Sequence, residues 1–146
     1  ERAKPFLPLL KGEGRGEVFL QRALATVHER VKKLSELPAL THFYFKRPDY
    51  DVALLVWKKA TPEITKNRLV GLVAFYESSV FPADEKALEE ATKAFIAKEQ
   101  FETGETLWPM LVALSGEKAS PGPFQMAVVL GKEETVARLQ MAIDKL

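Results

Sequence analysis

Few residues in this sequence have types and spacings that could support chemistry. The two histidines, His28 and His42, are not part of an H-E-x-x-H motif or of any other metal-ligand spacing. We therefore expect both to be surface or boundary residues, and we expect no metal site. The chain has no cysteine, which excludes disulfides, thiolate zinc sites and a cysteine nucleophile.

Serine nucleophiles and phosphate-binding loops are not recognisable either. No serine lies in a G-x-S-x-G turn, and Ser120 before Pro121 is typical of a helix cap. The glycine-rich stretch at 12–16 lacks the G-K-[ST] ending of a phosphate-binding loop. We interpret that stretch as a plain turn. The sequence shows no reaction centre, and we expect no cofactor.

Charged residues are unevenly distributed along the chain. Residues 1–73 hold fourteen Lys and Arg against eight Asp and Glu, whereas residues 74–146 hold seven against twelve. This asymmetry fits a polyanion bound on one side, and it equally fits chance variation in surface charge. The adjacent glutamate pairs at 89–90 and 133–134 do not face each other on a helix, so we expect them on solvated faces.

The elements that would position these side chains have mostly helical periodicity. Apolar residues recur every three or four positions across 17–34, which predicts an amphipathic helix. The next segment contains Pro38 and Pro48, which deny it a long helix. We expect a short helical turn and a loop there, with the aromatic residues 43–45 anchored in the core.

Capping signals divide the middle of the chain. Thr61 followed by Pro62 predicts the start of a helix that reaches about Ser79. The apolar face of this helix is expected to hold Leu69, Leu72, Val73, Tyr76 and Val80. Asp84 is expected to cap a further helix, with Leu88, Ala91 and Phe95 facing inward.

The last third of the chain predicts three more helical segments. The first spans 105–115 with Pro109 in its first turn, and the second begins at a Ser120–Pro121 cap and ends at Gly131 as a C-cap. A final amphipathic helix follows. Since no segment alternates like a strand, the fold class is all-α: a compact bundle of about six to eight helices. We expect two small helical subdomains, residues 1–50 and 51–146.

Three sequence blocks near the C-terminus occur in a specific order. They are LVALSG at 111–116, SPGPF at 120–124 and LGKE at 130–133, and an amphipathic helix follows them. In this arrangement they resemble the carboxy-terminal signature of bacterial glutamyl-tRNA synthetases. The first helix is similar to the same family at QR (21–22), ERVKKL (29–34) and ELP (36–38). The resemblance runs from about residue 17 to the end and is weak between 51 and 102.

This resemblance implies an all-helical anticodon-binding region of the α-cage type, downstream of a class I catalytic domain. The H-I-G-H-like and K-M-S-K-S-like motifs of such a catalytic domain are absent here. The expected function is therefore anticodon recognition within an ATP-dependent glutamate–tRNA ligase, with this chain non-catalytic by itself. ATP and Mg²⁺ would belong to the catalytic domain. The implied partners are glutamate tRNA and that domain, in a cytoplasmic, monomeric protein with no membrane contact.

The resemblance also assigns contacts to individual residues. Arg30 falls where the family has an arginine that reads the third anticodon base, and a planar guanidinium can donate to two acceptors on one base edge. The proline corner implies contacts to the other bases from Ser120, Pro121 and Pro123. Proline presents a rigid apolar surface to a ligand.

One position departs from the family. Leu111 stands where the family usually has an arginine, and leucine cannot donate to a base. Trp108, one helical turn earlier, could stack on a base or fill the core, and we favour the core. The candidate phosphate contacts are Lys32, Lys33, Arg47 and Lys118, which the sequence does not distinguish from solvated charges.

Two other functional classes stay open at this stage. A helical protein-interaction module could keep the fold after losing its RNA contacts, and Leu111 is the residue that favours it. An enzyme with an unrecognised pocket would need convergent titratable groups, which no motif indicates.

Overall fold

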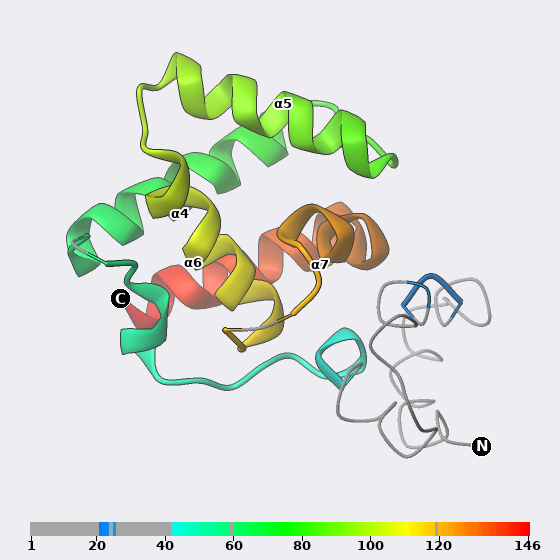
Figure 1. Ribbon diagram of the computed structural model, residues 1–146, viewed down its shortest axis with the longest axis horizontal. Coiled ribbons are helices and arrows are strands. Elements are labelled where there is room, and N and C mark those ends of the chain that lie inside the picture. The colour runs from blue at the N-terminus through cyan, green and yellow to red at the C-terminus, as the bar shows by residue number, and fades with distance from the viewer. Residues whose placement is uncertain (1–20, 24, 26–41, 59, 119) are drawn as a thin grey trace.

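The computed structural model describes residues 21–23, 25, 42–58, 60–118 and 120–146. Every regular element within these ranges is helical, which confirms the all-α prediction. After a helical turn at 42–45, the elements are the 3-10 helix η3 (Val52–Leu55) and the α-helices α4 (Pro62–Ser78), α5 (Glu85–Lys98), α6 (Thr103–Ser115) and α7 (Pro123–Lys145) (Figure 1). The proposed division at residue 50 stays a prediction.

Side-chain caps fix the starts of α4 and α5 as predicted. The Thr61 hydroxyl accepts a hydrogen bond from the Ile64 amide at 3.1 Å, and a proline occupies the first turn of α4. The Asp84 carboxylate accepts from the Ala87 amide at 2.9 Å at the start of α5. Such caps satisfy amides that have no intrahelical partner, so both helix starts are fixed locally.

The start of α6 differs from the prediction. The helix begins at Thr103, with Glu102 as its N-cap, so Pro109 lies in the interior and not in the first turn. Proline has no amide for the carbonyl of Glu105, which would normally break a helix. Pro109 is buried, and α6 packs against both α4 and α7. This tertiary packing offsets the missing hydrogen bond.

The start of α7 also differs, because Gly122 and not Ser120 is its N-cap. Pro123 occupies the first helical position, and the side chain of Gln125 accepts from the Gly122 amide at 2.9 Å. The Ser120 hydroxyl instead donates to the Pro121 carbonyl at 3.0 Å. A first-turn proline was thus correctly expected, but two residues too early.

Gly131 breaks the helical geometry without ending the element. Its φ of 84° and ψ of 167° lie outside the helical region, and α7 continues beyond it to Lys145. Glycine adopts positive φ without the penalty of a side chain. The predicted C-cap is therefore a kink, which divides α7 into an N-terminal and a C-terminal segment.

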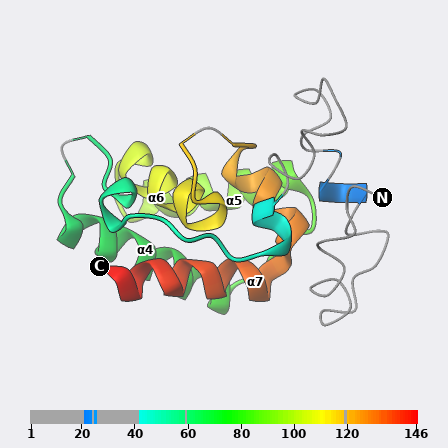
Figure 2. The ribbon, with the colours of Figure 1, turned by 90° about the horizontal axis from the view of Figure 1, so that it is seen from below.

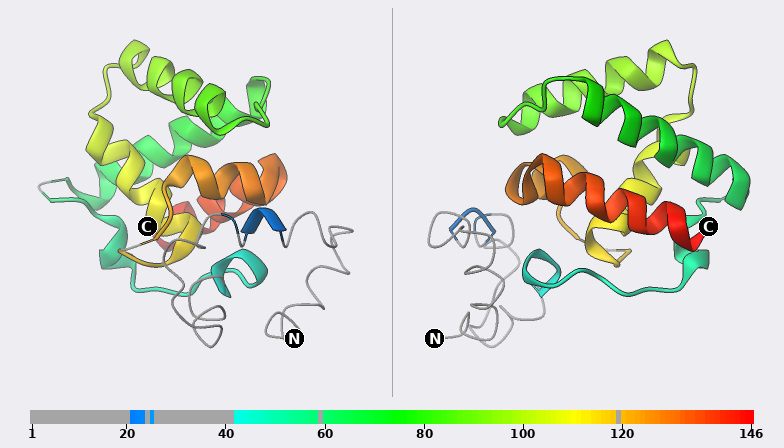
Figure 3. Two further views of the ribbon diagram at one scale, coloured as in Figure 1. Left: turned by 45° about the vertical axis from the view of Figure 1, so that its right-hand side comes forward. Right: turned by 180° about the vertical axis from the view of Figure 1, so that it is seen from behind.

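The helix α7 occupies the centre of the arrangement and contacts α4, α5 and α6 (Figures 1 and 3). The segment 46–50 crosses from the turn at 42–45 to η3 alongside α6 and α7 (Figure 2). The core includes Ala23, the aromatic residues 43–45 as predicted, and residues of all four α-helices.

Two predicted inward faces need correction. Val80 is 91% exposed because α4 ends at Ser78, two residues before it. In α5, Leu88 is buried as expected, but it is accompanied by Thr92 and Ile96. Ala91 and Phe95 are only partly buried, and they line an open hollow between α4 and α5.

Candidate functional site

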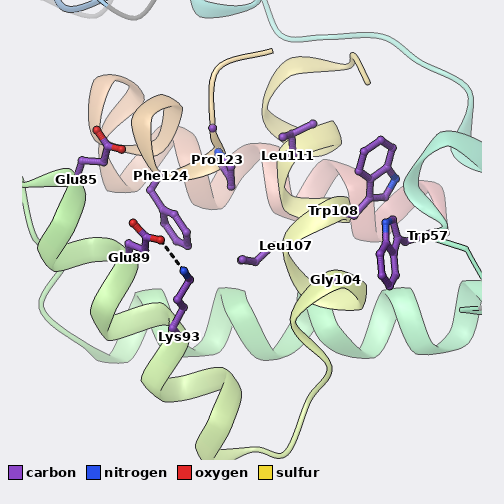
Figure 4. Close-up of a pocket in the computed structure, with 11 residues that line it drawn as sticks. Trp57, Glu85, Glu89, Lys93, Gly104, Leu107, Trp108, Leu111, Pro123 and Phe124 are labelled. Atoms are coloured by element: carbon purple, nitrogen blue, oxygen red, sulfur yellow. Dashed lines mark ion pairs between the residues drawn. The ribbon is translucent and has the colours of Figure 1, made fainter. Parts of the chain in front are cut away.

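A hollow of about 440 Å³ lies between α5, α6 and the start of α7 (Figure 4). Its walls are mainly apolar and include Trp57, Trp108, Leu111, Pro123 and Phe124. We call it the aromatic hollow. Concave apolar sites with a few polar groups at the margin are typical of ligand-binding surfaces.

Trp108 is held in place from the side of η3. It is partly buried against the core, and its indole N–H donates to the Leu54 carbonyl at 2.9 Å. The prediction that it belongs to the core is therefore correct only in part, since the ring also lines the hollow. Because its polar atom is already satisfied, its exposed surface offers stacking rather than a hydrogen bond.

Trp57 is a wall residue that sequence reasoning missed. Its ring lies against Gly104, where an added Cβ would come within 2.3 Å of the indole. The absence of a side chain at Gly104 therefore makes room for this ring. Trp57 and Trp108 are the only tryptophans in the sequence, and their rings lie near each other in Figure 4. The only advance signal was the residue type itself.

The proline corner contributes unequally to the hollow. Pro123 and Phe124 line it, whereas Pro121 is buried and Ser120 is partly exposed. Leu111 of α6 and Pro123 of α7 both line the hollow (Figure 4). The structure thus brings Trp108, Leu111 and Pro123 together, while Pro121 packs inside the corner. A role of these residues in binding RNA stays a prediction.

Charged groups lie at two margins of the hollow. On α5, the Lys93 ammonium pairs with Glu89 at 2.6 Å, and Glu85 lies one turn earlier (Figure 4). A second hollow of about 430 Å³ shares Trp57 and Trp108 and is lined on its far side by Lys118. The predicted phosphate candidate Lys118 is therefore exposed and next to the tryptophans.

A second polar arrangement lies inside the molecule, between α6, α7 and the segment that follows residue 45. Arg138 is 1% exposed and donates through Nε to Glu134 at 2.8 Å. Its Nη1 donates to the carbonyls of Leu114, at 2.7 Å, and of Phe43. Arg47 reaches the same carboxylate, with Nε and Nη2 each 3.0 Å from a Glu134 oxygen. We call Arg47, Glu134 and Arg138 the ionic junction.

The electrostatics of this junction favour an ionised Glu134. Burial alone would raise its pKa, but the hydrogen bonds from Arg47 and Arg138 outweigh burial and hold the pKa below its ordinary value. The expectation that Glu133 and Glu134 both lie on a solvated face is correct for Glu133 and wrong for Glu134. The sequence pattern lacked the information, because the arginine partner Arg47 is 87 residues away.

The remaining candidates are distributed as follows. Arg47 has a side chain that is 52% exposed although it is paired with Glu134. His42 is a boundary residue as predicted, and its Nε2 lies 3.7 Å from Oε1 of Glu117. Arg30, Lys32, Lys33 and His28, for which the sequence makes predictions, lie outside the described residues.

Within the part of the chain that the structure describes, no three His, Asp or Glu side chains are grouped in a way that could bind a metal ion. None of the described helices has the length and apolar character needed to cross a membrane.

Comparison with known sequences gives a consistent result. A family model described as an anticodon binding domain matches residues 1–143. A glutamate–tRNA ligase of Clostridium tetani is 32% identical over 143 residues, which cover 96% of this chain and 29% of that protein. One of Herpetosiphon aurantiacus is 38% identical over 120 residues, covering 82% of this chain and 24% of the relative. The chain thus spans less than a third of these relatives.

Comparison with solved structures supports the fold. The crystal structure of a glutamate tRNA ligase from Elizabethkingia meningosepticum, in complex with its amino acid, matches with a TM-score of 0.70 at 18% identity. The match covers 98% of this chain and 28% of that one. The enzyme from Elizabethkingia anophelis matches with a TM-score of 0.68.

Proposed function

The chain belongs to the anticodon binding domain family, and we propose that it recognises the anticodon loop of glutamate tRNA as part of a glutamate–tRNA ligase. The relatives that match most of this chain are named glutamate–tRNA ligases. The partners would be glutamate tRNA and the catalytic domain of the same ligase, which would hold ATP and Mg²⁺. The proposed setting is the cytoplasm, and the proposed state is a monomer.

The single observation that carries this proposal is the aromatic hollow. Both tryptophans of the chain line it, together with Leu111 and the proline corner. Single-stranded RNA loops are recognised by stacking unpaired bases on aromatic side chains, a contact typically worth ~1–3 kcal/mol per base. A base that entered the hollow would replace water on surfaces that the described residues leave uncovered.

The hollow favours stacking over hydrogen-bonded reading of a base edge. Leu111 provides an apolar contact where the family usually has an arginine, and the indole N–H of Trp108 is already committed to Leu54. We propose that the first two anticodon bases are held here mainly by shape and stacking. Arg30 would then supply much of the edge-specific reading, at the third base.

The test uses the tryptophans as reporters, because all indole fluorescence of this chain comes from the hollow. A glutamate anticodon stem-loop is titrated into the 146-residue chain across a salt series, next to a stem-loop with a scrambled anticodon. We expect a change in tryptophan emission and tighter binding of the native anticodon, with affinity falling as salt rises. Equal affinity for the two stem-loops would contradict anticodon recognition and favour the protein-interaction alternative.

Arg30 is tested in the same assay. Arg30→Gln is expected to relax the preference at the third anticodon base while circular dichroism shows an unchanged helix content. A variant that still discriminates among third bases as well as the unsubstituted chain would show that the assignment of Arg30 is wrong.

A further inference from the structure

We propose that Glu134 is a positioning residue that, anchored by Arg138, orients Arg47 to bind a backbone phosphate of the tRNA. The inference rests on the proposed function and assigns a role to a carboxylate that the sequence placed on a solvated face.

The anchor is rigid because Arg138 is tied to three parts of the chain. Its guanidinium donates to the carbonyl of Phe43 before the crossing segment, to that of Leu114 at the end of α6, and to Glu134 within its own helix. Both Glu134 and Arg138 are at least nine-tenths buried. A carboxylate held in this way cannot follow its partner, so Arg47 must adapt to Glu134.

The geometry at Arg47 fixes the plane of its guanidinium. Two parallel contacts of 3.0 Å join Nε and Nη2 to the two carboxylate oxygens, which is the bidentate arrangement that restricts arginine most strongly. The side chain nevertheless stays 52% exposed. An arginine whose exposed part already has a fixed orientation loses less conformational entropy when it binds a ligand.

The carboxylate does not simply cancel the charge of Arg47. Glu134 accepts hydrogen bonds from both arginines, and Oε2 is shared between Arg47 and Arg138. One negative charge is therefore divided between two guanidinium groups. Arginine is suited to phosphate because its planar donors match the phosphate oxygens. A pre-oriented cation at this place is consistent with a backbone contact rather than with a structural ion pair alone.

Arg47 also lies on the segment that leads to the hollows. Pro48, the next residue, lies under the corner between α6 and α7, where an added Cβ on Gly116 would come within 2.7 Å of it. Asp51, further along the same segment, lines the second hollow together with Lys118, Trp57 and Trp108. The segment that carries Arg47 therefore packs against the corner between α6 and α7 and continues into the wall of the second hollow.

The experiment measures the affinity of the 146-residue chain for the glutamate anticodon stem-loop across a salt series, for Arg47→Gln, Arg47→Lys and Glu134→Gln. Loss of one phosphate contact is expected to reduce the salt slope by about one and the affinity by about tenfold. Arg47→Gln is expected to show both. Arg47→Lys keeps the charge but cannot make the bidentate contact, so affinity is expected to fall although lysine still contacts phosphate.

The direction in which Glu134→Gln changes the affinity for RNA distinguishes positioning from a simple effect of net charge. Removing a negative charge beside an RNA site should tighten binding if only net charge matters. If positioning matters, Glu134→Gln weakens binding and lowers the salt slope as Arg47→Gln does. The double variant of Arg47→Gln and Glu134→Gln then loses no more affinity than either single variant. Glu133→Gln is the matched control, since it removes the same charge from the exposed neighbour. Circular dichroism at the assay temperature checks that each variant is folded.

Each outcome separates the two proposals. An unsubstituted chain that binds without anticodon preference overturns the proposed function and with it this inference. An unsubstituted chain that binds as expected, with an unchanged slope in Arg47→Gln or with tighter binding in a folded Glu134→Gln, overturns only the inference. If Glu134→Gln does not fold, the two Arg47 variants still decide whether the phosphate contact exists.

Discussion

The ionic junction and the aromatic hollow are both built on α6 and α7, yet they treat their functional groups in opposite ways. In the junction, a guanidinium that is 1% exposed donates to two carbonyls and a carboxylate of the same chain. In the hollow, two partly buried indole rings keep surface that the described residues leave exposed. The buried guanidinium of the junction stabilises the fold, whereas the indole rings of the hollow keep surface that is available for stacking.

In one small helical domain, the groups that stabilise the fold can therefore differ from those that are exposed for binding. Buried ionic groups that lose a partner destabilise strongly, because the remaining charge has no water to replace it. Exposed aromatic walls contribute less to folding, since part of their surface is already hydrated. Substitution of the buried anchor Arg138 should therefore change mainly the free energy of unfolding, whereas substitution of a wall residue of the hollow should change mainly binding.

The largest effect is expected from Arg138→Met. The substitution removes three hydrogen-bonding contacts and leaves a buried carboxylate with Arg47 alone. We expect the free energy of unfolding in urea to fall by about 3–5 kcal/mol. A fall of less than about 1 kcal/mol in the free energy of unfolding would mean that the junction stabilises no more than an exposed ion pair does. The proposed difference between the junction and the hollow would then be wrong.

The next largest effect is expected from Trp57→Ala, in the affinity for RNA. Trp57→Ala removes one wall of the hollow, and the affinity for the glutamate anticodon stem-loop should fall by the worth of a stacked base, ~1–3 kcal/mol. Its unfolding free energy should change less than that of Arg138→Met. A variant that is strongly destabilised but binds normally would place Trp57 with the core rather than with the site.

Acid should weaken the junction selectively. The pKa of Glu134 is lowered from 4.5 in the folded chain, so its stabilisation is complete above the ordinary pKa and is lost as the pH falls through the lowered value. The unfolding free energy of the unsubstituted chain should therefore decline as the pH falls below the ordinary pKa of 4.5. Glu134→Gln should show a shallower decline, and identical pH profiles would exclude Glu134 as a contributor.

The smallest change in stability is expected from Gly104→Ala. The added Cβ would meet the outer end of the Trp57 indole, which can rotate away, and alanine favours a helix over glycine by up to about 1 kcal/mol. We expect the two contributions nearly to cancel in urea unfolding. The displaced ring should still shift the tryptophan emission and weaken stem-loop binding, by less than Trp57→Ala does. Unchanged emission would mean that the ring is not held against Gly104.

The parts of this molecule that the sequence predicts are those specified by neighbouring residues. The Thr61 and Asp84 caps are determined within one helical turn, and both were correct. The start of α7 was misplaced because serine and glycine before proline are both acceptable caps, and here the Gln125 side chain accepts from the Gly122 amide.

The parts that the sequence does not predict depend on distant partners. Glu134 is buried because Arg47 approaches it from another segment, which no local pattern reveals. Trp57 lies outside any periodic element, so its place opposite α6 emerges only from the fold. Leu111 and Pro123 were named from resemblance and Trp108 from its residue type and helical spacing, and the structure brings the three to one hollow.

The kink at Gly131 has a consequence for how the domain opens. It separates a segment that holds Pro123 and Phe124 from a segment that holds Glu134 and Arg138. Helical hydrogen bonds support one another in succession, and that succession is interrupted where φ is 84°. Amide protons of 124–130 can then exchange with solvent through local opening, whereas those of 132–145 exchange only through a larger opening. The half of α7 that lines the aromatic hollow can loosen without releasing the half that holds the ionic junction.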